Sequence, residues 1–200
     1  MSEQLEIVCE QTGTPLGYSL PRHEAIAQGA WCQSTNVYVV NSAGQILCHQ
    51  RSLQKERLPG GWSTHLGGHV GAGEYFLSNA QKELEEEAGV ALAEHAFLPW
   101  RTSKLTRARL WVMDVVVHHD APLDAFTPQP GEVETFAWMH PQEIMSAYAQ
   151  APETWFAGTH HFPEDYACIR AVLAAAHHKG MIRPTHDIRR WHPLSAAMSA

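Results

Sequence analysis

The side chains of this sequence best placed to do chemistry are four glutamates within five positions: Glu83, Glu85, Glu86 and Glu87. On a helix, at about 100° of rotation per residue, Glu83, Glu86 and Glu87 share one face, and Glu85 points into solvent. Like charges at i and i+4 on a helix repel, so something must offset them. Carboxylate oxygens gathered in this way favour a hard divalent cation, Mg²⁺ or Mn²⁺ in its place. The alternative is a solvated acidic helix face.

A helix over residues 77–88 is the element that must position these acids. Its apolar stripe consists of Leu77, Ala80, Leu84 and Ala88. A stripe of this kind predicts that the helix packs on a sheet, with the three acids beside the core rather than opposite it. Gly89 stands where a helix often ends. The acids are therefore expected at the border between the core and solvent.

The spacing around this helix resembles a known motif. Gly68 is followed after five residues by Glu74, and after seven more by Lys82-Glu83-Leu84-Glu85-Glu86-Glu87-Ala88-Gly89-Val90. This pattern resembles the Nudix box, and its one departure is Lys82, where the family has Arg. The resemblance implies a Nudix-type α/β/α sandwich, in which a mixed β-sheet carries a loop–helix–loop catalytic motif.

The resemblance also implies roles for single residues. It places metal ligands at Glu83, Glu86 and Glu87, with the backbone carbonyl of Gly68 nearby. Glu74 resembles the family glutamate that pairs with the box arginine, which implies an ion pair with Lys82. Lysine has the charge of arginine but lacks its planar two-point geometry. The replacement therefore affects the contact with Glu74 more than the metal site.

Hydrolysis of a diphosphate is the reaction that the resemblance implies. Bound Mg²⁺ would neutralise the phosphates and activate a water, and a carboxylate would take the proton of that water. Candidates for this carboxylate are Glu86 or Glu87 in the helix and Glu132 or Glu134 from a later loop and strand. Glu134 is the choice among the later acids, because some family members place a fourth acid near this point. A solvated loop acid is the alternative there.

A second resemblance covers the segments around the box. Gln50-Arg51-Ser52, Lys55, residues 59–62 and residues 67–70 resemble the bacterial branch of the family near isopentenyl-diphosphate isomerase. That isomerase needs a protonating Cys where this chain has Gly67, which disfavours isomerisation. Arg51 and Lys55 are predicted to bind substrate phosphates and Trp62 to line the substrate site. Surface charge and loop packing are the alternatives for these three.

The order of the expected elements favours a mixed sheet over a doubly wound parallel one. Hairpins are predicted at 3–20 and 36–50, a short strand within 65–70, and strands at 110–117 and 133–139. Helices are predicted to start at Pro141 and Pro163. We predict one Nudix-type domain over 1–200, made of an N-terminal hairpin extension (1–33), a core (34–150) and a C-terminal helical extension (151–200).

Composition bounds the partners. With 14 basic and 21 acidic residues the formal net charge is −7, which argues against a protein that holds nucleic acid by its phosphates. No apolar run is long enough to span a membrane, and no secretory signal is visible after Met1. Four cysteines without a CxxC pair predict reduced thiols in a cytoplasmic protein. The expected partner is a small-molecule diphosphate, and a homodimer is left open.

Three functions are compatible with these observations. The first is hydrolysis of a diphosphate linkage in a nucleoside diphosphate derivative or a small organic diphosphate. The second is isomerase-like chemistry on an allylic diphosphate, which Gly67 disfavours. The third is a Nudix-fold sensor without catalysis, which would tend to have lost acids of the box. Because every acid of the box is present, we predict the hydrolase.

Overall fold

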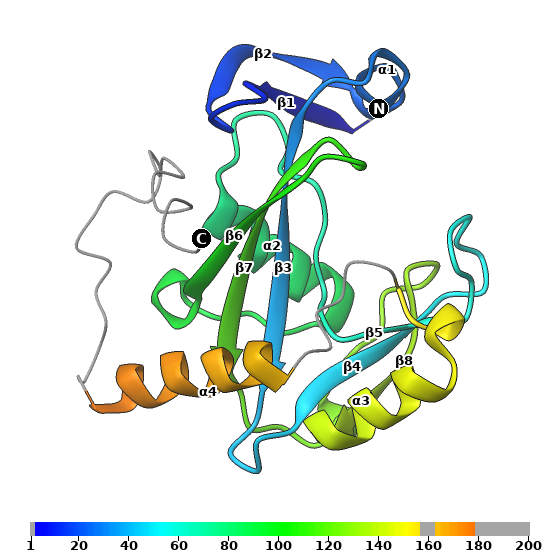
Figure 1. The fold of residues 1–200 in the computed structure, drawn as a ribbon, viewed down its shortest axis with the longest axis vertical. Helices are drawn as coiled ribbons and strands as arrows, with labels where there is room; N and C mark the ends of the chain where they lie inside the picture. The colour runs from blue at the N-terminus through cyan, green and yellow to red at the C-terminus, as the bar shows by residue number, and fades with distance from the viewer. Residues whose placement is uncertain (1–2, 157–162, 179–200) are drawn as a thin grey trace.

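A mixed six-stranded sheet organises the chain, and a two-stranded sheet lies at one end of it (Figure 1). This computed structural model describes residues 3–156 and 163–178. No helix in these residues has the length and apolar character needed to cross a membrane. The elements in chain order are β1 (Gln4–Val8), β2 (Pro15–Pro21), α1 (Arg22–Gln28), β3 (Cys32–Val40), β4 (Ile46–Arg51), β5 (Trp62–Ser63), α2 (Phe76–Ala88), η1 (Glu94–Ala96), β6 (Leu98–Leu105), β7 (Leu110–His118), η2 (Leu123–Ala125), β8 (Val133–Met139), α3 (Pro141–Gln150), η3 (Pro152–Thr154) and α4 (Pro163–His178).

Strand β3 is the axis of the large sheet. It pairs in parallel with β7 along its whole length, and β6 extends the sheet antiparallel to β7. On its other side β3 pairs with β4 only where Val40 meets Ile46. Beyond that point β4 pairs antiparallel with β8. The predicted hairpin at 36–50 therefore closes at its turn, and its two strands then part.

Where β4 no longer pairs with β3, the loop that leads into α2 forms hydrogen bonds with that edge of β3. Leu66 and Val37 exchange two backbone hydrogen bonds, and Val70 N donates to Gln33 O at 2.9 Å. These contacts are isolated bridges and do not form a regular strand. The short strand predicted within residues 65–70 is therefore wrong, although the segment does lie beside the sheet. Its position brings the start of the box against β3.

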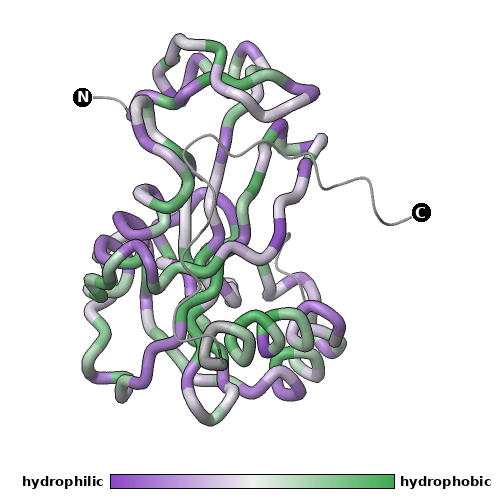
Figure 2. The backbone as a smooth tube through the Cα atoms, turned by 90° about the vertical axis from the view of Figure 1, so that its left-hand side faces the viewer, coloured by the Kyte–Doolittle hydropathy of each residue, from purple (hydrophilic) through white to green (hydrophobic). Residues whose placement is uncertain are grey.

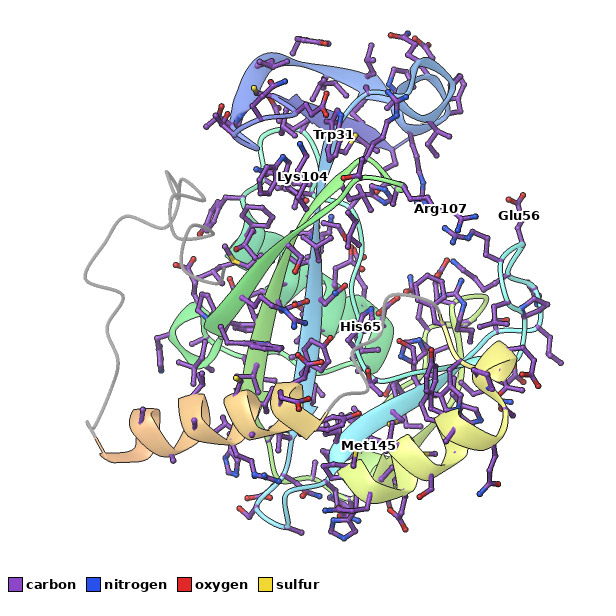
Figure 3. All side chains as sticks on the ribbon, in the orientation of Figure 1. Trp31, Glu56, His65, Lys104, Arg107 and Met145 are labelled. Carbon is purple, nitrogen blue, oxygen red and sulfur yellow. The ribbon has the colours of Figure 1, made fainter. Side chains whose placement is uncertain are left out.

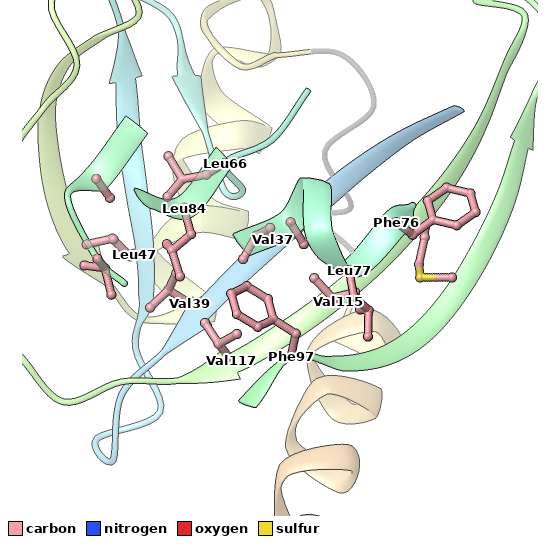
Figure 4. Close-up of a cluster of buried hydrophobic side chains, with 14 of the residues drawn as sticks. Val37, Val39, Leu47, Leu66, Phe76, Leu77, Leu84, Phe97, Val115 and Val117 are labelled. Atoms are coloured by element: carbon pink, nitrogen blue, oxygen red, sulfur yellow. The ribbon is translucent and has the colours of Figure 1, made fainter. Parts of the chain in front are cut away.

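Helix α2 covers one face of the sheet, and α3 and α4 cover the other (Figure 1). The strands between them carry the most hydrophobic stretches of the backbone, as Figure 2 shows. Successive strand residues point to opposite faces, and β3 is buried at every position except the half-buried Asn36, so both of its faces are covered. The core under α2 is mostly aliphatic (Figure 4); its members include Val37, Val39, Leu47, Leu66, Leu77, Leu84, Phe97, Val115 and Val117.

The core on the opposite face contains more polar atoms. It is built from β3, β4, β7, α3, α4 and the segment after η3. Its buried members are Tyr38, Val40, Ile46, Cys48, Val116, Ile144, Trp155, Tyr166, Ile169 and Leu173. Two of these are tyrosines and one is a tryptophan, so this face must also accommodate hydroxyl and indole groups.

The N-terminal hairpin of β1 and β2 forms as predicted, and α1 follows it without having been predicted. Lys104 lies between Trp31, at 4.7 Å from the ring centroid, and Trp111, at 5.8 Å (Figure 3). Ala72 N donates to Gln4 O at 2.9 Å, so β1 also contacts the loop that leads into α2. The division of the chain into extension, core and extension stays a prediction.

Candidate functional site

Helix α2 has the limits and the buried stripe that the sequence predicts. It begins after Tyr75, whose N–H donates to Ser78 Oγ at 3.0 Å, while that hydroxyl donates to Tyr75 O at 2.8 Å. It ends at Gly89, where φ is 71° and the N–H donates to Glu85 O at 2.9 Å. The stripe residues are each at most 1% exposed: Leu77, Ala80, Leu84 and Ala88. The face bearing the acids is thereby fixed relative to the sheet.

Glu87 is the acid that the fold holds most tightly. Its side chain is buried, and its Oε2 accepts a hydrogen bond from Gly67 N at 2.9 Å. Burial raises the pKa of Glu87 to about 8, and the neighbouring charge of Glu83 acts in the same direction. The Gly67 bond opposes this rise without cancelling it. Near neutral pH the charge on Glu87 is therefore costly unless a cation lies close by.

Glu83 lies beside Glu87, one helical turn earlier. Burial raises its pKa to about 7; Lys82 opposes the rise and Glu86 adds to it. The carboxylate packs directly on the loop, because a Cβ at Gly68 would lie 2.5 Å from Glu83 Oε1. A side chain at position 68 would therefore displace the Glu83 carboxylate.

The Gly68 carbonyl oxygen, predicted as a neighbour of the metal, is used inside the protein. It accepts from Thr35 N at 3.0 Å, from Ser34 Oγ at 2.9 Å and from Asn79 Nδ2 at 3.3 Å. These bonds fix the orientation of the carbonyl, and its place beside a metal stays a prediction. Gly67 is equally constrained, because its φ is +138° and a Cβ would lie 2.0 Å from Thr35 O. The two glycines thus fix the path of the loop beside the carboxylates of α2.

The fourth acid that the structure brings to the site is Glu132, whereas the prediction chose Glu134. The charge of Glu132 contributes to the raised pKa of Glu87, and Glu132 forms an ion pair with Lys55. Glu134 is exposed on β8 and is not among the charges that act on Glu87. The pairing of β4 with β8 shifts register so that Arg51 faces Val133 and Glu134 is left out.

The three predicted substrate-binding residues have different surroundings. Arg51 is close enough to Glu87 and Glu132 for their charges to oppose the lowering of its pKa by burial. Lys55 is paired with Glu132. Trp62 packs against Trp155, with ring centroids 6.5 Å apart. The contact of Trp62 supports loop packing, which was the alternative to a role in binding substrate.

The Glu74–Lys82 pair predicted from the box is present. Lys82 Nζ lies 2.9 Å from Glu74 Oε1 and 3.0 Å from Oε2, so one ammonium contacts both oxygens. Glu74 Oε2 also accepts from Gly71 N at 2.9 Å. The lysine therefore replaces the two-point contact of an arginine with one nitrogen held between two oxygens. This arrangement joins the loop before α2 to the helix.

A divalent cation fits the donors that this face offers. Within the described ranges, no three His, Cys, Asp or Glu side chains form a ready-made ligand set. Glu83 and Glu87 are nevertheless hard oxygen donors whose charges are unfavourable alone, and Glu86 is exposed beside them. A bound cation would stabilise the ionised form of each carboxylate. The chemistry of the donor set thus suits Mg²⁺ or Mn²⁺ better than a soft metal.

Comparison with known proteins agrees with this geometry. Residues 31–160 match the family model of the NUDIX domain. An uncharacterized Nudix hydrolase of Pseudomonas aeruginosa is 37% identical over 169 residues, which cover 83% of this chain and 91% of that protein. The uncharacterized Nudix hydrolase YfcD of Escherichia coli is 30% identical over 149 residues, 72% of this chain and 73% of that protein.

Two further matches differ in how much of the other protein they cover. Nudix hydrolase 3 of Arabidopsis thaliana is 32% identical over 154 residues, 72% of this chain, but the match spans only 20% of the plant protein. A crystal structure of a Deinococcus radiodurans protein superposes with a TM-score of 0.63 at 20% identity, covering 85% of this chain and 99% of that one. The likeness in structure supports the fold. The family-model match over residues 31–160 and the Pseudomonas aeruginosa relative show that this chain belongs to the Nudix family and is a pyrophosphohydrolase.

Proposed function

We propose that this enzyme hydrolyses the diphosphate linkage of a nucleoside diphosphate derivative or a small organic diphosphate, with Mg²⁺ or Mn²⁺ held by Glu83, Glu86 and Glu87. One observation carries the proposal: the half-buried Glu83 and the buried Glu87 lie one helical turn apart with raised pKa values, and neither forms an ion pair within residues 3–156 and 163–178. The nearby lysines are already paired with other acids, Lys82 with Glu74 and Lys55 with Glu132.

Nudix hydrolases use divalent metal ions, and such an ion supplies charge neutralisation and an activated water. The protein contributes the positions of the groups around it. The Gly67 N–H fixes one oxygen of Glu87, which leaves the other to face the site. Glu86 and Glu87 are our candidates to accept a proton from the water, with Glu132 in place of Glu134 as the acid from the later loop. Arg51 is the proposed contact for a phosphate.

Isomerase-like chemistry is disfavoured by the position of the thiols. The box loop contains no cysteine, and Cys48 belongs to the core on the opposite face of the sheet from α2. Burial raises the pKa of Cys48 far above its usual value, so it does not supply a proton-transfer group. The likeness to the branch near isopentenyl-diphosphate isomerase stays a prediction. So do the cytoplasmic location, the absence of nucleic-acid partners and a homodimer.

A phosphate-release screen tests the proposal. ADP-ribose, NADH, nucleoside triphosphates and organic diphosphates are each incubated with and without Mg²⁺, and at least one is expected to turn over only with metal. Glu87→Gln and Glu86→Gln should each reduce kcat by about 10²–10⁴-fold. Glu85→Gln, on the solvent side of the same helix, is the matched control and should retain parent activity. Parent-like turnover by the Glu87 variant would refute the assignment.

A further inference from the structure

Two arginines near the proposed site share one aromatic ring. The Cζ atom of Arg51 lies 4.6 Å from the ring centroid of Phe156, and that of Arg57 lies 5.6 Å from it. Arg51 Nε also donates to the backbone carbonyl of Arg57 at 3.1 Å. Across residues 3–156 and 163–178, neither guanidinium forms an ion pair with a carboxylate. Two positive charges are thus held together without a direct anionic partner.

The ring of Phe156 is fixed by the fold. Its backbone N–H donates to Trp62 O at 2.8 Å, and the preceding Trp155 forms a bridge with Trp62. On another side the ring meets His65 edge to face, with centroids 6.4 Å apart. His65 itself lies beside β3 (Figure 3), 5.5 Å from the ring of Tyr38. Phe156 is therefore a rigid platform that sets where both guanidiniums stand.

This platform is contiguous with the acidic site. The charges of Glu87 and Glu132 act on Arg51, which links the platform to α2. Arg57 is exposed in the loop between β4 and β5 and contacts the same ring. A polyphosphate with one phosphate group at Arg51 would have Arg57, on the same ring, as a neighbouring cationic contact. Lys55 is not available in the same way, because it is paired with Glu132.

A cation–π contact of about 0.5–2 kcal/mol orients a guanidinium but does not remove its charge. Two arginines on one ring repel, and phosphate oxygens are the groups that their forked donors fit best. We propose that Arg51 and Arg57, positioned by Phe156, form a recognition site for a further phosphate beyond the hydrolysed diphosphate. This rests on the proposed function, and it predicts a preference for triphosphate over diphosphate substrates.

The binding test needs neither metal nor turnover. Inorganic tripolyphosphate and inorganic diphosphate are titrated calorimetrically into the metal-free protein. The parent should bind tripolyphosphate more tightly, and Arg57→Gln should weaken that binding by at least about tenfold while changing diphosphate affinity by less than about twofold. Arg57→Lys should restore part of the loss. Arg170→Gln removes an exposed arginine of α4 and should change neither affinity.

Phe156 is tested as a positioning residue. Phe156→Leu should reproduce the loss of tripolyphosphate affinity with both arginines present, whereas Phe156→Tyr keeps the ring and should bind like the parent. If a nucleoside triphosphate is hydrolysed, Arg57→Gln should raise its KM at least about tenfold and leave kcat within about twofold. Equal affinity of the parent for both polyphosphates, or an unchanged affinity in Arg57→Gln, would overturn the proposal. Either result would leave the metal-dependent hydrolysis untouched.

Discussion

The two faces of the large sheet both contain buried charge, and they treat it in opposite ways. On the face covered by α2, Glu83 and Glu87 lie side by side with raised pKa values. On the face covered by α4, Asp114 and Asp165 are also buried, yet each is bonded to Arg101. Buried charges that are paired hold structure together, whereas buried like charges indicate a site that awaits a ligand.

The network on the α4 face spans three strands and a helix. Arg101 Nε donates to Asp114 Oδ2 at 2.8 Å, and Arg101 Nη1 donates to Asp165 Oδ1 at 2.6 Å. Asn36 Nδ2 donates to the other oxygen of Asp114 at 2.8 Å. These bonds tie β6 to β7, β7 to β3, and α4 to the sheet. We therefore assign this cluster to stability rather than to catalysis.

The largest effect that we expect separates the two clusters by stability. Asp114→Ala removes the buried carboxylate that accepts from Arg101 Nε and Asn36 Nδ2, and Arg101 keeps only its bond to Asp165. The free energy of unfolding should fall by about 3–5 kcal/mol, as measured by urea denaturation. Asp120→Ala, an exposed carboxylate beside Ser42 and His118, is the control and should change stability by less than about 0.5 kcal/mol. If the free energy of unfolding fell only slightly in Asp114→Ala, the Arg101 network would not stabilise the fold, and the proposed difference between the two faces would be lost.

The second effect is a pH dependence that belongs to the α2 face. Folding raises the pKa values of Glu83 and Glu87 from 4.5 to about 7 and about 8, so the folded state binds more protons than the unfolded state between these values. Stability of the metal-free protein is then fully present below pH 4.5 and falls as pH rises towards 8, by about 1.4 kcal/mol per pH unit for each group while it titrates.

Denaturation curves between pH 5 and pH 8 measure this decline. Glu87→Gln removes one titrating group and should flatten the decline over the upper part of the range. Addition of Mg²⁺ at pH 8 should stabilise the parent more than the variant, because a cation offsets the charges of both glutamates. A parent protein that gains stability from pH 5 to pH 8 would show that these carboxylates are already neutralised.

The smallest effect concerns a hydroxyl on the α4 face. Tyr38 is 1% exposed, and its hydroxyl has no hydrogen-bond partner in the described part of the chain. Tyr38→Phe should leave stability unchanged or raise it by up to about 1 kcal/mol. Tyr75→Phe is the matched control, because it removes a hydroxyl that donates to Glu94, and it should cost about 1 kcal/mol. A clear loss of stability in Tyr38→Phe would show that the Tyr38 hydroxyl has a hydrogen-bond partner on this face.

Local patterns in the sequence were sufficient for the helix that carries the acids. The periodicity of its apolar residues and Gly89 predicted its limits, its buried stripe and the face of Glu83 and Glu87, and the family resemblance predicted the Glu74–Lys82 pair. Strands β7 and β8 and the starts of α3 and α4 were also predicted, because β-branched runs and helix-opening prolines are signals within a few residues. Strand β6 was missed because Leu98–Leu105 contains Pro99 and no clear alternation of buried and exposed residues.

Long-range pairing decided the rest. The choice of Glu132 over Glu134 depends on a register shift between β4 and β8, which no spacing within 132–134 encodes. The meeting of Arg51, Arg57 and Phe156 depends on a chain segment about a hundred residues away folding back onto Trp62. A helix face is set by hydrogen bonds four residues apart and is readable from the sequence. Contacts between distant segments are set by the packing of the whole sheet, and only the tertiary structure shows them.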